Sequence, residues 1–189
     1  MKITQGETKM MNQVIVGAWD IDVRVKDWPK EVNSAEEQLN KHIGASYKVF
    51  AYLGKQVVKG INYAVLAEQT LATVGEDNNV VLVIFNVWED KIVITSIERV
   101  LEGHEIPGGI VVAPTTDIPE EAMKDFEKVF NGFVGSDVKP FAYLGSQVVS
   151  GINRFLAAEV KPVTPHAKTK VSLVTVNAKC NTLNIANIL

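Results

Sequence analysis

The stretch Phe50 to Asn62, FAYLGKQVVKGIN, returns 91 residues later as Phe141 to Asn153, FAYLGSQVVSGIN. Eleven of the 13 positions are identical, and the two that differ exchange polar residues. A match of this length inside one chain indicates an internal duplication. The stretch reads as an alternating run, a short loop and a second strand-like run, which predicts a β-hairpin with two neighbouring valines at its tip.

The duplication extends on both sides of this stretch without a gap. Gly17 aligns with Gly108, and Gly44 aligns with Gly135. Downstream, residues 82–97 and 173–188 share five of 16 positions, so the second copy has diverged but keeps its register. We therefore predict two units, 14–98 and 105–189, joined at the segment 99–105.

Each unit is expected to contain an extended trunk, one helix and four strands. In the first unit the strands are predicted near 47–54, 61–72, 80–87 and 91–97, and alternating apolar residues predict which positions face the core. In the second unit Thr116 or Asp117 is expected to cap the helix, Pro119 suits its first turn, and Gly135, like Gly44 in the first unit, is expected to end it. The predicted fold class is α+β: two tandem units, each with one helix packed on a curved antiparallel sheet of four to five strands. The positions predicted to face the core are Val83, Phe85, Val87, Val174, Val176 and Ala178 on strands, and Met123, Phe126, Val129, Phe130 and Phe133 on the second helix, with Val32, Ala35, Gln38, Leu39 and His42 as their equivalents in the first.

Composition narrows the classes of function. The chain of 189 residues is 47% hydrophobic and 22% charged, which is typical of a globular protein, and its formal net charge of −3 indicates no nucleic-acid partner. A single cysteine, no apolar signal core and no apolar run long enough to cross a bilayer predict a cytoplasmic protein without a membrane partner. A secreted protein whose signal was removed stays open as the alternative.

Enzyme chemistry finds little support in the sequence. Cys180 and one of the three histidines could form a thiol–imidazole pair, but Cys180 lies in the least preserved loop of one copy only. The histidines show no spacing typical of a metal site, and the carboxylates near 120–127 are typical of a solvated helix face. We therefore expect no catalytic residues, no cofactor and no metal.

The order of trunk glycine, helix, Gln-Val-Val-x-Gly hairpin and second hairpin resembles the cystatin family, whose members inhibit papain-like cysteine proteases. Ile106-Pro107-Gly108-Gly109 is similar to the trunk of the stefins, the disulfide-free branch of that family. Both Gln-Val-Val-x-Gly loops are similar to its first binding loop. The chain is thus identified as resembling two tandem cystatin-like repeats.

The resemblance implies a reversible inhibitor that fills the protease cleft without being cleaved. A trunk glycine lets the backbone run close to the enzyme, and stiff β-branched valines lose little entropy on docking. The first unit has Ala18-Trp19 after its trunk glycine and carries Trp88 near the second loop, whereas the second unit has Lys179-Cys180-Asn181 there. The residues expected to bind the protease are Gly17, Gln56, Val57, Val58, Lys59, Gly60 and Trp88 in the first unit, and Gly108, Gly109, Gln147, Val148, Val149, Ser150 and Gly151 in the second.

Other interpretations of the same residues remain open. The valines of either hairpin could belong to the core, Trp88 could pack on a neighbouring strand, and residues 106–109 could be only a linker. The alternative function is a non-inhibitory module that binds another protein or a small ligand. Because duplicated hairpins can exchange strands, both a monomer and a domain-swapped dimer are possible.

Overall fold

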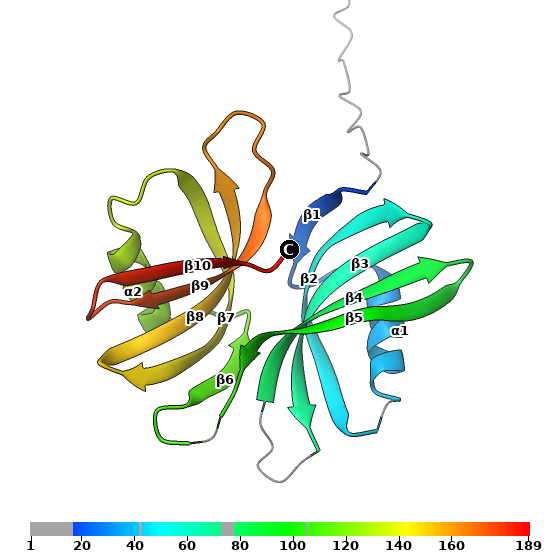
Figure 1. Cartoon of the computed structure of the whole chain (residues 1–189), viewed down its shortest axis with the longest axis horizontal. Coiled ribbons are helices and arrows are strands. Elements are labelled where there is room, and N and C mark those ends of the chain that lie inside the picture. The colour runs from blue at the N-terminus through cyan, green and yellow to red at the C-terminus, as the bar shows by residue number, and fades with distance from the viewer. Residues whose placement is uncertain (1–16, 42, 73–77, 105) are drawn as a thin grey trace, which may run out of the picture.

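The protein folds into two antiparallel β-sheets of five strands each (Figure 1). The computed structural model describes residues 17–41, 43–72, 78–104 and 106–189. In both sheets, strands that follow one another in the chain are neighbours, with orders β1-β2-β3-β4-β5 and β10-β9-β8-β7-β6. Each sheet is therefore a meander with one helix inserted after its first strand.

The two halves of the chain contain the same elements in the same order. The first half comprises β1 (Trp19–Arg24), α1 (Lys30–Leu39), β2 (Ala45–Val58), β3 (Gly60–Leu71), β4 (Asn78–Trp88) and β5 (Lys91–Glu102). The second comprises β6 (Ile110–Thr115), α2 (Glu120–Phe130), β7 (Ser136–Val149), β8 (Gly151–Pro162), β9 (Lys170–Asn177) and β10 (Thr182–Asn187).

The duplication is visible even in the irregularities of the sheets. The pairing of β2 with β3 shifts register between Val49 and Ala51 and again between Tyr52 and Gly54. The pairing of β7 with β8 shifts at the corresponding places, between Pro140 and Ala142 and between Tyr143 and Gly145. Bulges of this kind bend a long hairpin, so both copies curve in the same way.

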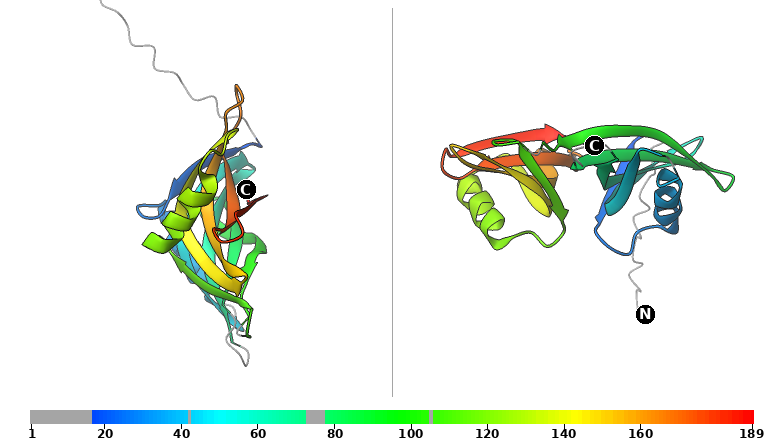
Figure 2. Two further views of the ribbon diagram at one scale, coloured as in Figure 1. Left: turned by 90° about the vertical axis from the view of Figure 1, so that its left-hand side faces the viewer. Right: turned by 90° about the horizontal axis from the view of Figure 1, so that it is seen from below.

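One hydrophobic core joins the two sheets. It is built from one face of each sheet and includes Leu53, Leu66 and Leu82 from the first half and Leu144 and Ala157 from the second, all buried. Two further clusters lie on the opposite faces, where α1 covers the first sheet and α2 covers the second. Figure 2 shows the result: the helices lie on the outside and the sheets between them.

The predicted fold class is therefore wrong. We expected an α+β protein of two tandem cystatin-like units, each one helix packed on its own sheet around a core of its own. The structure is mostly β, with ten strands and two short helices in the described residues, and its two sheets form a β-sandwich-like arrangement around a shared core.

The physical reason can be read in the strands themselves. Residues 64–67 and 80–83 are consecutive apolar residues, and all eight are buried. A strand that is buried on one face only alternates between buried and exposed residues, whereas a strand covered on both faces becomes a continuous apolar run. The alternation around Val83 and Phe85, which are both buried, predicts a single covered face, whereas the continuous apolar runs require a second layer.

The helices begin and end near the predicted places, but with different caps. Pro119, not Thr116 or Asp117, occupies the N-cap position of α2, and no side chain caps the helix. Both helices end before the glycines expected to stop them, at Leu39 and Phe130. Four side chains of α2 pack against the second sheet as predicted: Met123, Phe126, Val129 and Phe130. Phe133 lies beyond the end of α2 and is exposed, and His42 lies outside the described residues.

The hairpin tips of the two halves lie at opposite ends of the molecule. In Figures 1 and 2 the turn between β4 and β5 lies at one end of the long axis, and the turn between β9 and β10 lies at the other. In the described part of the chain, no helix is long and apolar enough to cross a membrane.

Candidate functional site

The structure brings the trunk glycine of each half against the first hairpin of that half. This hairpin is formed by β2 and β3 in the first half and by β7 and β8 in the second. Gly17 donates its backbone N–H to the carbonyl of Val57 at 3.0 Å, and Gln56 donates its Nε2 to the carbonyl of Gly17 at 2.8 Å. Gln147 repeats the second bond, with Nε2 3.0 Å from the carbonyl oxygen of Gly108. We call the group Gly17, Gln56 to Gly60 and Trp88 the first tip region, and the group Gly108, Gln147 to Gly151 and Lys179-Cys180 the second tip region.

Both trunk glycines adopt a conformation that favours glycine. Their φ angles are +84° for Gly17 and +78° for Gly108, in the left-handed region where a Cβ is unfavourable. Both are exposed, and a Cβ on either would meet no atom within 4 Å. Gly109 differs from them, because it closes a tight turn by donating its N–H to the carbonyl of Ile106 at 2.8 Å.

The hairpin valines point outward more in the second half than in the first. Val148 is 70% exposed and Val149 is 45% exposed, whereas Val58 is 38% exposed and Val57 is half-buried. The hairpin tips therefore present β-branched apolar side chains to solvent, and the interpretation of these valines as core residues fails for three of the four.

Gly60 and Gly151 close the two first hairpins with positive φ angles of +85° and +92°. Both also lie against the second hairpin of their own half. A Cβ on Gly60 would lie 2.4 Å from the carbonyl oxygen of Val87, and one on Gly151 would lie 2.8 Å from the Cβ of Lys179. The first and second hairpins of each half are thus neighbours at their tips.

The second hairpin of the first half carries an exposed aromatic side chain. Trp88 is 43% exposed, and the Nζ of Lys59 lies 5.4 Å from the centre of its ring. The turn that follows consists of Glu89 and Asp90, both with positive φ as in a two-residue β-hairpin turn. An indole held between a lysine and a tight turn is available to pack against a partner.

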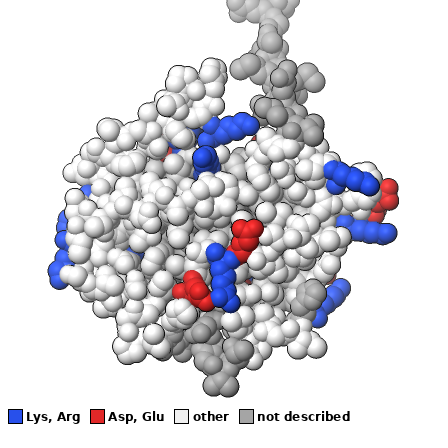
Figure 3. Space-filling view, viewed as in Figure 1, with Lys and Arg blue, Asp and Glu red and all other residues white. Residues whose placement is uncertain are grey.

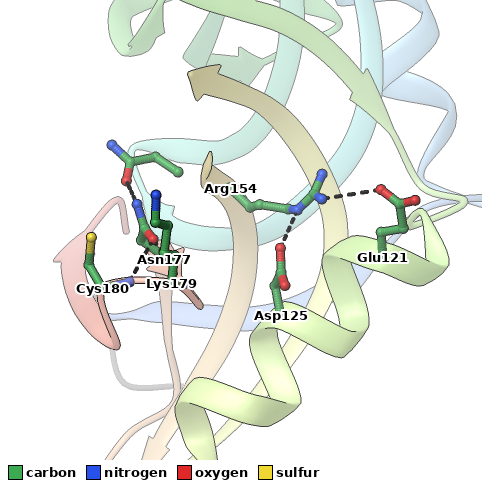
Figure 4. Close-up of polar contacts among 7 residues, drawn as sticks. Glu121, Asp125, Arg154, Asn177, Lys179 and Cys180 are labelled. Carbon is green, nitrogen blue, oxygen red and sulfur yellow. Dashed lines mark hydrogen bonds and ion pairs between the residues drawn. The ribbon is translucent and has the colours of Figure 1, made fainter. Parts of the chain in front are cut away.

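The second half replaces this tryptophan with a polar turn. Cys180 is exposed, and its Sγ lies 3.1 Å from the carbonyl oxygen of Ser150, so it binds the first hairpin. The Oδ1 of Asn177 accepts the backbone N–H groups of Lys179 and Cys180 (Figure 4). Within the described residues, no three His, Cys, Asp or Glu side chains lie close enough together to hold a metal ion.

Four asparagines at the tips escaped the sequence interpretation. Asn62 and Asn86 in the first half, and Asn153 and Asn177 in the second, form hydrogen bonds that continue from Gln56 and Gln147. Asn62 and Asn153 lie inside the repeated 13-residue stretch, and Asn86 recurs as Asn177 among the five matches downstream. Their retention in both copies, as polar residues inside apolar strands, was the signal available.

One charged side chain near the second tip region connects β8 to α2. Arg154 follows the second tip region along β8 and donates to Asp125 at 2.7 Å and Glu121 at 3.3 Å on α2 (Figure 4). Burial lowers the pKa of Arg154, but the hydrogen bond and charge of Asp125 raise it, and the net shift is upward. Lysine, arginine, aspartate and glutamate are scattered over the face seen in Figure 3, without a large patch of one sign.

A hollow of about 250 Å³ lies between the two halves. The residues that line it include Trp28, Lys48, Phe50 and Glu68 from the first half and Thr115 and Thr116 from the second. Lys48 and Glu68 are paired at the end of β2 and β3 that is remote from Val58 and Gly60. The hollow is therefore separate from the first tip region.

Comparison with known proteins adds no family to this description. No protein-family model matches the chain, and no curated protein matches it either.

Proposed function

We propose that the protein is a reversible inhibitor of papain-like cysteine proteases, related to the cystatins, and that each tip region occludes one protease cleft. The observation that carries the proposal is the contact of a Cβ-free trunk with a valine-bearing hairpin in both halves. Exposed valines beside a glycine suit such a cleft, because the valines offer apolar contacts and the glycine lets the two backbones approach closely.

The shape of the tip regions supports a binding role rather than a catalytic one. Valines lose little side-chain entropy on docking, and an exposed tryptophan is among the side chains that contribute most to protein interfaces. A cytoplasmic location fits the single cysteine, which is exposed and free.

The experiment is a titration of papain with the full chain and with three variants. Val57→Asp/Val58→Asp disables the first tip region, Val148→Asp/Val149→Asp disables the second, and the third variant combines all four changes. Because the tips lie at opposite ends of the molecule, we expect one chain to bind two papain molecules. Each double variant should bind one, and the combined variant should bind none.

The control is Val163→Asp, which introduces one aspartate at a valine that is 71% exposed and lies just beyond β8, at the end remote from Gly151. It should inhibit like the unmodified chain. Full inhibition by the combined variant would exclude the hairpins from the mechanism, and no inhibition by the unmodified chain at micromolar concentration would reject the proposal.

The hollow between the halves favours a second candidate, a module that binds a small ligand. Trp28 and Phe50 supply apolar surface there, and Lys48 and Glu68 supply opposite charges. In that case a ligand should raise the melting temperature of the unmodified chain but not that of Phe50→Ala, and the hairpin variants should respond like the unmodified chain.

A further inference from the structure

A row of side-chain amides crosses each half near its tip region and connects the trunk glycine, the first hairpin and the second hairpin. In the first half the row consists of Gln56, Asn62 and Asn86, which lie directly opposite one another on β2, β3 and β4. Side chains of directly opposite residues lie on the same face of a sheet, so these three amides meet. No side chain outside this row connects the trunk glycine to the second hairpin among the hydrogen bonds of the described residues.

The bonds of the first row run in one direction. Asn86 Nδ2 donates to Asn62 Oδ1 at 2.8 Å, and Asn62 Nδ2 donates to Gln56 Oε1 at 2.8 Å. Gln56 Nε2 then donates to the carbonyl of Gly17 at 2.8 Å. Asn86 Nδ2 also reaches the carbonyl of Lys59 at 3.2 Å, inside the hairpin turn.

The second half repeats every step of the row. Asn177 Nδ2 donates to Asn153 Oδ1 at 3.0 Å, Asn153 Nδ2 donates to Gln147 Oε1 at 3.1 Å, and Gln147 Nε2 donates to the carbonyl of Gly108 at 3.0 Å. Asn177 also bonds the carbonyl of Ser150, which occupies the place of Lys59. The downstream parts of the two repeats, residues 82–97 and 173–188, share only five of 16 positions, yet Asn86 recurs there as Asn177 and completes the row in both.

Such a row is stiffer than separate hydrogen bonds. Each internal amide donates and accepts at once, and neighbouring hydrogen bonds in a partly buried chain polarise and strengthen one another. Asn62 and Asn153 are only partly exposed, so the loss of one member leaves its neighbours short of partners that water supplies poorly. In the first half, the row therefore adds a side-chain connection from the exposed trunk to β3 and β4, beside the backbone bond from Gly17 to Val57.

We propose that these amide rows are positioning elements that hold the trunk glycine, the first hairpin and the second hairpin in one rigid arrangement before a partner arrives. The structural part of this proposal stands alone, and its effect on binding rests on the proposed inhibitory function. A tip that is ordered in advance loses less conformational freedom on docking, and this loss opposes binding.

The test uses Asn62→Leu, which breaks the first row in the middle while keeping the size of the side chain. It is made in the full chain with Val148→Asp/Val149→Asp, so that only the first tip region binds. In the free protein, we expect the ¹⁵N relaxation of the Gly17 amide to show increased motion. With papain, we expect the dissociation rate to rise about tenfold and the association rate to change less than threefold.

A second variant tests the direction of the row. Asn62→Asp keeps an oxygen to accept from Asn86, but its carboxylate cannot donate to Gln56. Below its pKa, about 4 in an unperturbed aspartate, the carboxyl regains a proton and a donor. The order of the Gly17 amide should therefore be low at neutral pH and should recover at about pH 3, whereas Asn62→Leu should show no recovery.

The matched control is Thr70→Val, which removes the hydrogen bond from Thr70 Oγ1 to Asn78 Oδ1. This bond also joins β3 to β4, but at the ends of these strands that are remote from the row. It should leave the motion of Gly17 and both papain rates unchanged. An unchanged Gly17 amide in Asn62→Leu overturns the proposal, whether or not the protein inhibits papain. If papain is not inhibited at all while Gly17 loses its order, the row stands as a positioning element and the inhibitory function fails.

Discussion

Gly60 is the residue on which the shape of the first hairpin tip depends most directly. Its φ angle of +85° requires the left-handed region, and its backbone lies so close to the second hairpin that a Cβ would overlap the carbonyl oxygen of Val87. Gly132 offers a comparison, because its φ angle is +81° but a Cβ there would meet nothing within 4 Å. A substitution at Gly132 therefore tests backbone strain alone, whereas one at Gly60 tests strain together with crowding.

We expect Gly60→Ala to lower the free energy of unfolding more than Gly132→Ala. The left-handed conformation alone should make Gly132→Ala less stable by about 1 kcal/mol, and crowding should bring the loss in Gly60→Ala to about 3 kcal/mol. Urea unfolding followed by circular dichroism measures both. Equal losses of unfolding free energy would show that the second hairpin moves to make room for the Cβ at no energetic cost.

Tyr52 makes the stability of the fold dependent on alkaline pH. It is buried, and burial, followed by the nearby charge of Asp22, raises the pKa of its phenol well above the usual value of about 10. The folded chain thus keeps a proton that the unfolded chain releases near pH 10. The stabilisation is complete below that pH and is lost as the pH rises above it.

The free energy of unfolding should therefore fall above pH 10, with a contribution from Tyr52 of at most about 1.4 kcal/mol per pH unit. Tyr52→Phe should show a shallower fall over the same range, because phenylalanine has no proton to lose. Urea unfolding at a series of pH values measures the two slopes. Parallel curves for the two proteins would mean that Tyr52 ionises equally well in both states.

At the scale of the elements, the two second hairpins differ although the first hairpins are nearly identical. The hairpin of β4 and β5 carries Trp88 beside Lys59, and the hairpin of β9 and β10 carries Cys180 against Ser150. The same sheet geometry therefore presents an aromatic surface at one tip and a polar one at the other. We expect the two tip regions to differ in affinity for the same protease.

Trp88→Ala should weaken papain binding by the first tip region about 30-fold, or roughly 2 kcal/mol, because a buried tryptophan is a typical centre of an interface. The measurement is made in the chain with Val148→Asp/Val149→Asp. Val93→Ala serves as the control, since Val93 is 56% exposed on the adjacent β5, and it should change the affinity little. If both variants bind like their parent, Trp88 faces solvent in the complex.

At the scale of the whole molecule, the shared core makes the two halves depend on each other. Leu144 lies in the second half and is fully buried in the cluster that joins both sheets. All three tryptophans, Trp19, Trp28 and Trp88, lie in the first half, so tryptophan fluorescence follows the unfolding of that half alone. This distribution provides a direct test of cooperativity.

Leu144→Ala should lower the free energy of unfolding by about 2 to 5 kcal/mol, as measured by tryptophan fluorescence in urea. Circular dichroism, which follows both halves, should give the same midpoint. A fluorescence midpoint that stays in place while the circular dichroism midpoint falls would show two independent domains.

The tip regions were predictable because they depend on local features that a duplication repeats. A glycine at a turn, adjacent valines at a hairpin tip and a glutamine beside them occur at the same offset in both copies, and the structure places each trunk glycine against its hairpin. The amide rows were harder to recognise, because Asn62 and Asn86 are 24 residues apart and meet only when β3 and β4 pair in the right register.

The duplication, most of the strands and the hairpin tips can be predicted from the amino-acid sequence, because they follow from repeated residues, periodicity and turn chemistry over short distances. The packing of the two sheets face to face is seen only in the folded protein, in the core that both sheets share. The apolar runs at 64–67 and 80–83 show that a strand is covered on both sides, but they do not name what covers it. Which layer covers the strand depends on how well two curved surfaces fit together. This fit involves segments that are distant in the sequence, so neither segment alone predicts it.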